Sequence, residues 1–322
     1  MRRREFLTVL GSAVLMSPIA ARAQRAIATI GVLWPGAEPP APPRMESFRQ
    51  ALRQLGFVEG QNLAIELRYA RKGLPQLPEL ATDLVGMNVD VLATFGDLTP
   101  KIAQQATTTI PIVAISDDIM GAGLVPSLSR PDGNTTGLSI MSAELSAKRL
   151  EVLQELVPKM TRVAALWDPT TGASQLEQTE RAAKTLGLTL QVLEIRRRDD
   201  ISLAFRAARD GRSEALNVFS SPFLASLYRE IITLSAEYRI PAIYQWKEHV
   251  EAGGLISYGP SLAAMWRQAG AIVVKILKGA KPADLPVEQP TKFELAVNAR
   301  TAQTLGFPIP PSILVRADDL IE

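Results

Sequence analysis

The sequence predicts an α/β protein that contains two similar domains, each built on a parallel sheet. Short apolar runs alternate with amphipathic, helix-type segments along most of the chain, which is typical of βαβ units. The 322 residues exceed what one hydrophobic core usually holds, so two domains are expected. The alternation also stops near the middle of the chain and then restarts in a similar form.

The first half of the chain is expected to alternate between buried strands and surface helices. We expect strands at 26–34, 62–69, 89–96 and 110–115, and helices at 44–56, 77–88 and 100–108. The helix at 44–56 is expected to end at Gly56. The stretch at 116–140 is rich in Gly, Pro, Ser and Asp, and we expect it to be mainly loop.

The second half repeats the alternation with its own helix and strands. A helix is expected at 142–158, followed by strands at 162–167, 188–195, 214–220, 240–245 and 254–259 with helices between them. The segment ALWDP resembles the earlier VLWPG, and RAAKTLGL resembles QALRQLGF. Trp34 lies 22 residues before Gly56, and Trp167 lies 20 residues before Gly187. Chance similarity is an alternative, but two similar domains in tandem are the more economical interpretation.

The first 23 residues, MRRREFLTVLGSAVLMSPIAARA, have the pattern of a cleaved export signal. A basic start precedes a short apolar run, and small residues stand at Ala21 and Ala23, so we expect cleavage after Ala23 and a periplasmic protein. Arg3-Arg4-Glu5-Phe6-Leu7 fits the core of a twin-arginine signal. Ordinary secretion, an uncleaved anchor and a buried N-terminal helix are the alternatives.

The charge balance argues against nucleic-acid and anionic-membrane partners, and the hydropathy argues against a membrane span after the signal. Without residues 1–23, the 35 basic residues become 31 and the 33 acidic residues become 32, so the formal charge changes from +2 to −1. This balance gives no support for a nucleic-acid or anionic-membrane surface. No later segment is long and apolar enough to span a bilayer.

The chain contains no cysteine and one histidine, which narrows the possible chemistry. Disulfides, thiol nucleophiles and Cys-ligated zinc are excluded, and a histidine-centred metal site or Ser-His-Asp triad would need His249. His249 lies in the amphipathic stretch KEHVEAGG, and we expect it on a solvated helix face. The G-x-S-x-G, G-x-G-x-x-G and Walker A motifs are also missing, which disfavours an enzyme.

Residues just after the strands are the best candidates for a binding site. In open parallel sheets, ligands bind outside the carboxyl ends of the strands, and two facing domains would enclose a cleft there. The candidates combine aromatic rings, aspartates, small hydroxyls and turn glycines. They are Trp34, Gly36, Gly96, Asp97, Leu98, Thr99, Asp117, Asp118, Trp167, Asp168, Ser221, Tyr244 and Tyr258. The same strand-end segments also contain Ser220, Pro222 and Trp246.

This combination favours a small zwitterion such as an amino acid. Aromatic walls with a few polar groups are typical of small-molecule sites. Thr99 is a plausible N-cap with Pro100 in the first helical position, and such a helix start suits a ligand carboxylate. An aspartate could bind an ammonium group. Taken singly, each of these loops has an ordinary structural explanation, because Asp and Ser commonly cap helices and Pro and Gly commonly form turns.

Several segments carry a family resemblance, among them LGFVEGQNLAIELRYA, SLSRPDGNTTGLS and ELSAKRLEVLQELVP. They resemble the ABC-transporter substrate-binding protein family related to tryptophan- and tyrosine-type binding proteins, and the resemblance covers nearly the whole chain after the signal. Its most specific part is the stretch from Gly253 to Glu322. The resemblance implies the type I periplasmic-binding-protein fold, in which two Rossmann-like lobes with parallel sheets are joined by a three-crossover hinge.

The resemblance also implies lobe boundaries and further ligand contacts. Lobe 1 would comprise 27–138 with 260–286, and lobe 2 would comprise 139–259 with 287–322. The first crossing would fall near 134–139, which adds Thr136 and Ser139 to the candidate ligand contacts. Relatives commonly have Gly-Gly-Thr-Pro where this chain has 96–100, and often a single Asp-Pro where Asp117-Asp118 stands. The additional acid, Asp97, favours a ligand with an extra cationic or hydroxyl group nearby.

The expected function is solute binding for an ABC importer. The two lobes would close over a small carboxylate-bearing ligand, an amino acid or a related compound, and present it to a membrane permease with its cytoplasmic ATPase. No cofactor, metal or catalytic residue is expected, and a monomer is the family expectation. A sensor that docks on a signalling receptor is the first alternative, and an exported enzyme is the second.

Overall fold

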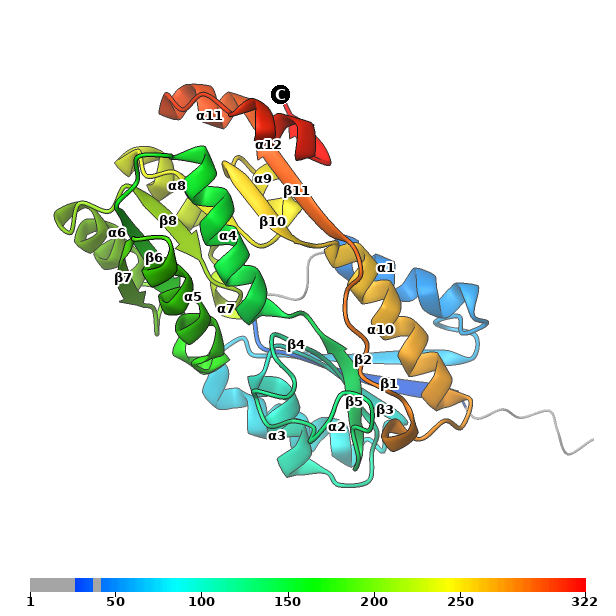
Figure 1. Ribbon diagram of the computed structural model, residues 1–322. Helices are drawn as coiled ribbons and strands as arrows, with labels where there is room; N and C mark the ends of the chain where they lie inside the picture. The colour runs from blue at the N-terminus through cyan, green and yellow to red at the C-terminus, as the bar shows by residue number, and fades with distance from the viewer. Residues whose placement is uncertain (1–26, 37–41) are drawn as a thin grey trace, which may run out of the picture.

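The computed structural model describes residues 27–36 and 42–322. The expected export signal at 1–23 therefore lies outside the described part of the chain. Two sheets form the centres of two lobes, which lie side by side in Figure 1. We call the five-stranded sheet with its helices the first lobe, and the seven-stranded sheet with its helices the second lobe.

The first lobe is an all-parallel sheet with helices on both faces. The strands run in the order β2-β1-β3-β4-β5. They span Ala28–Trp34 (β1), Leu63–Tyr69 (β2), Val91–Phe95 (β3), Ile112–Ser116 (β4) and Thr135–Ser139 (β5). Apolar side chains of α1 (Pro42–Gln54) and α10 (Leu262–Leu277) pack on one face, and those of α2 (Leu77–Gly86) and α3 (Leu98–Ala106) pack on the other. Two 3-10 turns are Leu74–Gln76 and Pro282–Asp284.

The second lobe repeats this arrangement and extends it. Its sheet has the order β12-β11-β10-β9-β8-β6-β7. The strands are Arg162–Trp167 (β6), Thr189–Glu194 (β7), Ala215–Val218 (β8), Ala242–Tyr244 (β9), Ile256–Pro260 (β10), Phe293–Asn298 (β11) and Asp319–Ile321 (β12). The order β7-β6-β8-β9-β10 matches β2-β1-β3-β4-β5, and Trp34 and Trp167 end the corresponding strands β1 and β6. The topology therefore agrees with the repeat seen in the sequence.

Helices cover both faces of the second sheet as well. Side chains of α4 (Ser142–Leu156), α5 (Ser174–Thr185), α11 (Ala299–Leu305) and α12 (Pro311–Arg316) form a core on one face. Side chains of α6 (Asp200–Asp210), α7 (Pro222–Ser226) and α8 (Tyr228–Tyr238) form a core on the other. A 3-10 turn at Pro169–Thr171 and the short helix α9 (Lys247–Glu251) complete the lobe.

Two strands at one edge of the second sheet, β11 and β12, depart from the expected all-parallel arrangement. β11 runs antiparallel to β10, while its other neighbour, β12, is parallel to it. The chain leaves the second lobe at the end of β10 and returns from the first lobe at the start of β11. It therefore enters the sheet from the same end at which β10 leaves, and the two strands must run in opposite directions.

The chain passes between the lobes three times, after β5, after β10 and before β11 (Figure 1). Ser139 pairs with Ser116 of β4, and the backbone N–H of Glu288 donates to the carbonyl of Gly137 at 2.9 Å. Pro260 is the last residue of β10. These pairings place Ser139 and Glu288 with the first sheet and Pro260 with the second, whereas the boundaries drawn from the resemblance place each of them in the opposite lobe.

Two other expectations differ from the structure. The stretch 116–140 contains the buried strand β5, whose sequence TTGLS is polar but whose two threonine hydroxyls are hydrogen-bonded. Thr136 Oγ1 donates to the carbonyl of Leu285 at 2.7 Å, for example. His249 is 5% exposed instead of solvated, and its ring stacks on Tyr228 with centroids 5.0 Å apart. Burial lowers the pKa of His249 to about 3, so it is neutral at physiological pH.

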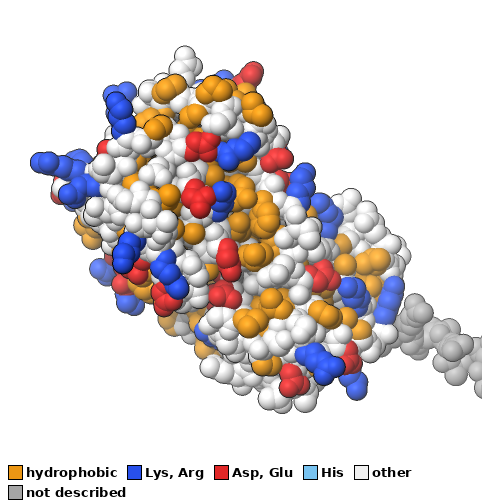
Figure 2. Space-filling model, in the orientation of Figure 1, with side chains coloured by type: hydrophobic (Ala, Val, Ile, Leu, Met, Phe, Trp, Pro, Cys, Tyr) orange, Lys and Arg blue, Asp and Glu red, His pale blue; other side chains and the backbone are white. Residues whose placement is uncertain are grey.

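The surface carries charges of both signs on each lobe. Figure 2 shows Lys and Arg side chains interspersed with Asp and Glu on the face drawn, with apolar atoms between them. Within the described residues, no helix has the length and apolarity to cross a membrane.

Gly137 is expected to tolerate no side chain. Its φ is +146°, and a Cβ would lie 1.9 Å from the carbonyl oxygen of Ala114 in the neighbouring strand. Gly137→Ala should therefore lower the free energy of unfolding by more than about 3 kcal/mol in a urea titration. Gly133→Ala is the control, because Gly133 also has a positive φ (+65°) but open space around its Cβ position. That variant should lose about 1 kcal/mol. Equal losses would contradict the close approach of β5 to β4.

Candidate functional site

The two lobes meet at the carboxyl ends of their parallel strands, and a narrow cavity lies between them. Aromatic and aliphatic side chains form most of its wall, with one arginine, one aspartate and two serines. The lining residues are Trp34, Arg44, Phe95, Gly96, Ile115, Asp117, Ile140, Ser220, Ser221, Pro222, Ala225, Trp246, Leu262 and Trp266. The cavity has room for about 50 Å³ of solvent, so a ligand as large as an aromatic amino acid requires the lobes or these side chains to move.

Three aromatic rings from the first lobe form a continuous wall of the cavity. Phe95 stacks on Trp266 with ring centroids 4.2 Å apart, and Trp34 lies 5.4 Å from Phe95 in an edge-on arrangement. Trp34 and Trp266 are 6.1 Å apart. Trp246, at the start of α9, belongs to the same apolar cluster. Such walls bind flat apolar groups by stacking and edge-on contacts.

Arg44 supplies the cationic group of the cavity. It lies in the first turn of α1, half-buried, with its guanidinium carbon 6.0 Å from the centre of the Trp34 ring. Burial lowers the pKa of Arg44, while Glu248 and Tyr228 of the second lobe raise it. Within the described residues, no carboxylate lies within 4 Å of its guanidinium.

Asp117 connects the two lobes at the base of the cleft. It follows β4 in the first lobe and is 2% exposed. Its Oδ1 accepts a hydrogen bond from Ser142 Oγ at 2.7 Å, where α4 begins, and another from Ser220 Oγ, just after β8. Both donors belong to the second lobe, so these bonds hold the lobes together.

A second carboxyl and a buried guanidinium flank Asp117. Asp97 Oδ1 accepts from Ser116 Oγ at 2.5 Å and from the backbone N–H of Asp117 at 2.9 Å. Arg149, on α4, is fully buried and donates to the carbonyl of Tyr258 and to Ser146 Oγ. Burial lowers the pKa of Arg149 to about 9, and the negative charge of Asp117 opposes that shift.

Burial raises the pKa values of both carboxyls, and the charge of a neighbouring aspartate adds to each shift, Asp117 for Asp97 and Asp168 for Asp117. Burial is the larger cause for Asp97, the charge of Asp117 adds to it, and the pKa reaches about 7. Burial also raises the pKa of Asp117, against the hydrogen bonds from Ser220 and Ser142 and the charge of Arg149. Near neutral pH, the pair therefore shares less than two full negative charges.

A smaller recess continues from the main cavity past Gly96. It is lined by Pro35, Leu74, Phe95, Gly96, Asp97, Leu98, Asp168, Thr170, Thr171, Pro222 and Phe223. Asp168 is held in place there, because its carboxylate accepts from the N–H and hydroxyl of Thr170 and from Ser221 Oγ. The hydrogen bond from Ser221 to Asp168 thus fixes the positions of both side chains within the second lobe.

The structure brings about half of the sequence-predicted residues to these two spaces. Trp34, Gly96, Asp117 and Ser221 line the cavity, and Asp97, Leu98 and Asp168 line the recess. Gly36 forms a buried bend directly after β1 and lines neither space. Asp118 also lies outside both, and its Oδ1 accepts from the N–H of Gly121 at 2.9 Å.

The other predicted residues have structural contacts instead. Thr99 is not an N-cap, because α3 begins at Leu98 and Thr99 Oγ1 exchanges hydrogen bonds with the backbone of Phe95. Tyr244 is 1% exposed in the core of the second lobe. Trp167 donates its indole N–H to the carbonyl of Gly172, and the ring of Tyr258 stacks on Phe293.

Thr136 and Ser139 belong to β5 and pair within the first lobe. Thr136 donates its hydroxyl to Leu285, and the backbone N–H of Ser139 donates to the carbonyl of Glu288. Both side chains are buried and lie outside the cavity wall. They are therefore contacts of the crossover region.

Sequence reasoning missed the lining residues that lie on helices. Arg44 is on α1, and Leu262 and Trp266 are on α10, so a search of the segments after strands does not reach them. Phe95 is the last residue of β3, one position before the strand-end segment that begins at Gly96. The conspicuous signal was Trp266 itself, one of only four tryptophans in the chain.

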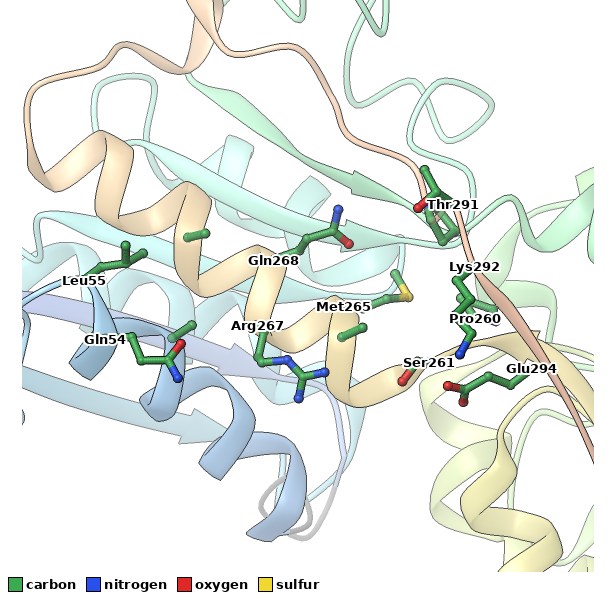
Figure 3. A pocket seen from close by; sticks show the side chains of 14 residues that line it. Gln54, Leu55, Pro260, Ser261, Met265, Arg267, Gln268, Thr291, Lys292 and Glu294 are labelled. Carbon is green, nitrogen blue, oxygen red and sulfur yellow. The ribbon is translucent and has the colours of Figure 1, made fainter. Parts of the chain in front are cut away.

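A larger and more open hollow lies beside the segments that cross between the lobes, and several charged and polar side chains line it. It is about 610 Å³ and runs between α1, α10 and the segment before β11. Figure 3 shows Arg267 and Gln268 on α10, with Lys292 and Glu294 on the segment at the start of β11. Arg267 and Lys292 are exposed, whereas Met265 and Pro260, which also line the hollow, are buried. Long side chains at an open surface provide little enclosure, so the smaller cavity between the lobes is the better candidate site. Within the described residues, no group of acidic and histidine side chains could hold a metal ion.

Comparison with known proteins identifies the family. The model of the ABC transporter substrate binding protein family matches residues 30–321. The tyrosine-binding protein of Clostridioides difficile is 25% identical over 265 residues, which cover 81% of this chain and 75% of the relative. The structure of an ABC domain in complex with L-Trp from Streptococcus pneumoniae has a TM-score of 0.85 at 24% identity, covering 92% of this chain and all of the other.

A third relative has been solved in another state. The ligand-free, open form of a substrate-binding protein from Clostridium difficile has a TM-score of 0.65 at 24% identity, covering 92% of this chain and 99% of the other. The chain belongs to the ABC transporter substrate binding protein family, which is a family of binding proteins and not of enzymes.

The raised pKa of Asp97 predicts a pH-dependent stability. The native pKa of about 7 exceeds the unfolded value of 3.8, so the native state binds this proton more tightly. The stabilisation that proton binding to Asp97 contributes is fully present below about pH 4. It decreases as the pH rises to about 7 and does not change further above that pH. Asp97→Asn should remove this dependence and raise the melting temperature above that of wild type at pH 8.

The control for this experiment is Asp210→Asn. The Asp210 side chain is 70% exposed, and its loss should leave the profile of melting temperature against pH unchanged in shape. Melting curves from pH 4 to 8.5 measure both variants. A profile of Asp97→Asn that runs parallel to wild type would contradict a buried, proton-binding Asp97.

Proposed function

We propose that this protein binds an aromatic amino acid in the cavity between its lobes and delivers it to an ABC importer. The observation that carries the proposal is the composition of the cavity wall. Trp34, Phe95 and Trp266 form an aromatic surface, while Arg44 and Asp117 supply one group of each charge. A flat ring with an ammonium and a carboxylate matches that combination.

Hinge closure is the proposed mechanism. We take 27–139 with 261–288 and 140–260 with 289–322 as the moving units, since the sheet pairing follows these limits. In the closed form, Ser220 reaches Asp117, and Gly96 packs against Pro222 from the other lobe. Separation of the lobes would break both contacts and open the aromatic wall to solvent.

The energy available from ring burial is of the size that closure requires. An aromatic side chain buries roughly 150–250 Å², worth about 4–6 kcal/mol at about 25 cal/mol per Å². Moving a two-state equilibrium from 1:99 to 99:1 needs about 5.5 kcal/mol of differential affinity. Only the area that becomes buried on closure contributes to this differential affinity, so covering the second side of the ring supplies part of the change and the polar contacts supply the rest.

The relatives support the ligand class and the closed form. One relative is named as a tyrosine-binding protein, and another was solved with L-Trp. This chain has the higher TM-score with the L-Trp complex, 0.85, and the lower one, 0.65, with the open, ligand-free relative. The family and the expected signal at 1–23 support an extracytoplasmic location and a permease as partner.

Calorimetric titration tests the ligand. Mature protein from residue 24 should bind at least one of L-tryptophan, L-tyrosine and L-phenylalanine with a negative heat-capacity change, because binding buries apolar surface. L-Lysine and L-glutamate, which lack a ring, serve as controls and should bind at least tenfold more weakly. Absence of binding to all three aromatic amino acids at millimolar concentration would overturn the proposed ligand class.

Gly96 offers a test of closure itself. A Cβ on Gly96 would lie 2.7 Å from Pro222 Cγ across the cleft, so Gly96→Ala should weaken binding of the aromatic ligand by tenfold or more. Gly123→Ala is matched for backbone strain, because Gly123 has φ +70° against +79° for Gly96, but its Cβ position is open. Both variants should lose about 1 kcal/mol of stability. If both bind as wild type does, the Gly96–Pro222 contact plays no part in closure.

A further inference from the structure

We propose that Arg44 binds the ligand carboxylate and thereby makes a free α-carboxylate a requirement of the site; this inference rests on the proposed function. Arg44 is the only cationic residue in the described wall of the cavity. The other nearby guanidinium, that of Arg149, is fully buried behind Asp117 and takes no part in the wall.

Within residues 27–36 and 42–322, the surroundings hold the Arg44 guanidinium at the cavity without forming an ion pair with it. It lies 6.0 Å from the Trp34 ring centre, within reach of a cation–π contact, and thus beside the aromatic wall that would take the ligand ring. Its position in the first turn of α1 adds the positive end of the helix dipole. A ligand carboxylate next to the Trp34 ring would therefore be attracted by the Arg44 guanidinium and by the positive end of the α1 dipole.

The titratable groups that face Arg44 come from two elements of the opposite lobe. These are Glu248 on α9 and Tyr228 on α8. Neither forms an ion pair with it within 4 Å in the described residues, so the guanidinium keeps donors for another acceptor. A guanidinium binds a carboxylate through two parallel hydrogen bonds, whereas a lysine ammonium acts as a point charge.

Arg44 and Asp117 together would orient a zwitterion. The guanidinium of Arg44, a residue of α1, lies beside the Trp34 ring, and the carboxylate of Asp117 follows the end of β4. Because each charge occurs once in the described cavity wall, an amino acid bound in reverse would place like charges together. The site would thus discriminate between an amino acid and the amine that remains after its carboxylate is removed.

The experiment compares ligands that differ only in the carboxylate. L-Tryptophan is titrated against tryptamine, and L-tyrosine against tyramine, into wild type, Arg44→Gln and Arg44→Lys. Arg44→Gln should weaken binding of the amino acid by roughly 10- to 100-fold and leave the amine within threefold of wild type. Arg44→Lys should fall between, because it restores charge without the bidentate geometry. Circular dichroism melting checks that each variant is folded.

Glu248→Gln separates ligand binding from a direct attraction between the lobes. If Arg44 acts through Glu248, then Glu248→Gln should weaken binding as much as Arg44→Gln does, and the inference is overturned. If Arg44 holds the ligand carboxylate, Glu248→Gln should bind the amino acid as tightly as wild type or more tightly.

The remaining outcomes are equally decisive. Equal losses for amino acid and amine in Arg44→Gln would mean that Arg44 supports the Trp34 ring, and unchanged affinity for both would mean that it does not contact the ligand. Each result overturns the inference while the proposed function stands. Wild-type protein that binds none of the four probes would overturn the proposed function, and the role of Arg44 with it.

Discussion

The hydrogen bonds of Asp117 are the interaction on which the contact between the two lobes depends. Its carboxylate belongs to the first lobe, but Ser142 and Ser220, which donate to it, belong to the second. A buried carboxylate without donors is costly, so the lobes satisfy it only while they are together. The positive charge of the buried Arg149 guanidinium offsets part of the negative charge of Asp117. The same contact encloses the aromatic wall, which couples the polar base of the cleft to the apolar site above it.

Most of the fold followed from the sequence because its strands are apolar runs separated by amphipathic helices. The repeat from Trp34 to Gly56 and from Trp167 to Gly187 also corresponds to matching strands in the two sheets. β5 was not predicted, because its Thr and Gly residues resemble a loop until tertiary hydrogen bonds satisfy them. The direction of β11 depends on where the chain returns from the other lobe, which local sequence does not encode.

The candidate site was predicted less completely, for a physical reason. The rule that ligands bind after parallel strands selected Trp34, Gly96, Asp117 and Ser221, and the structure places all four in the wall of the cavity. It could not find Arg44 and Trp266, which reach the cavity from helices. It also could not tell that Tyr244 and Thr99 point into their own lobes, because side-chain direction at a strand end depends on packing.

The distance between the lobes, measured with and without ligand, tests the central claim most directly. The chain has no cysteine, so spin labels can be placed at Glu79→Cys on α2 and Glu180→Cys on α5, both exposed. Double electron–electron resonance should give a broad or long distance distribution without ligand and one shorter, narrower distance with saturating aromatic amino acid. An identical distribution in both samples, with binding confirmed by calorimetry, would contradict closure of the lobes over the ligand.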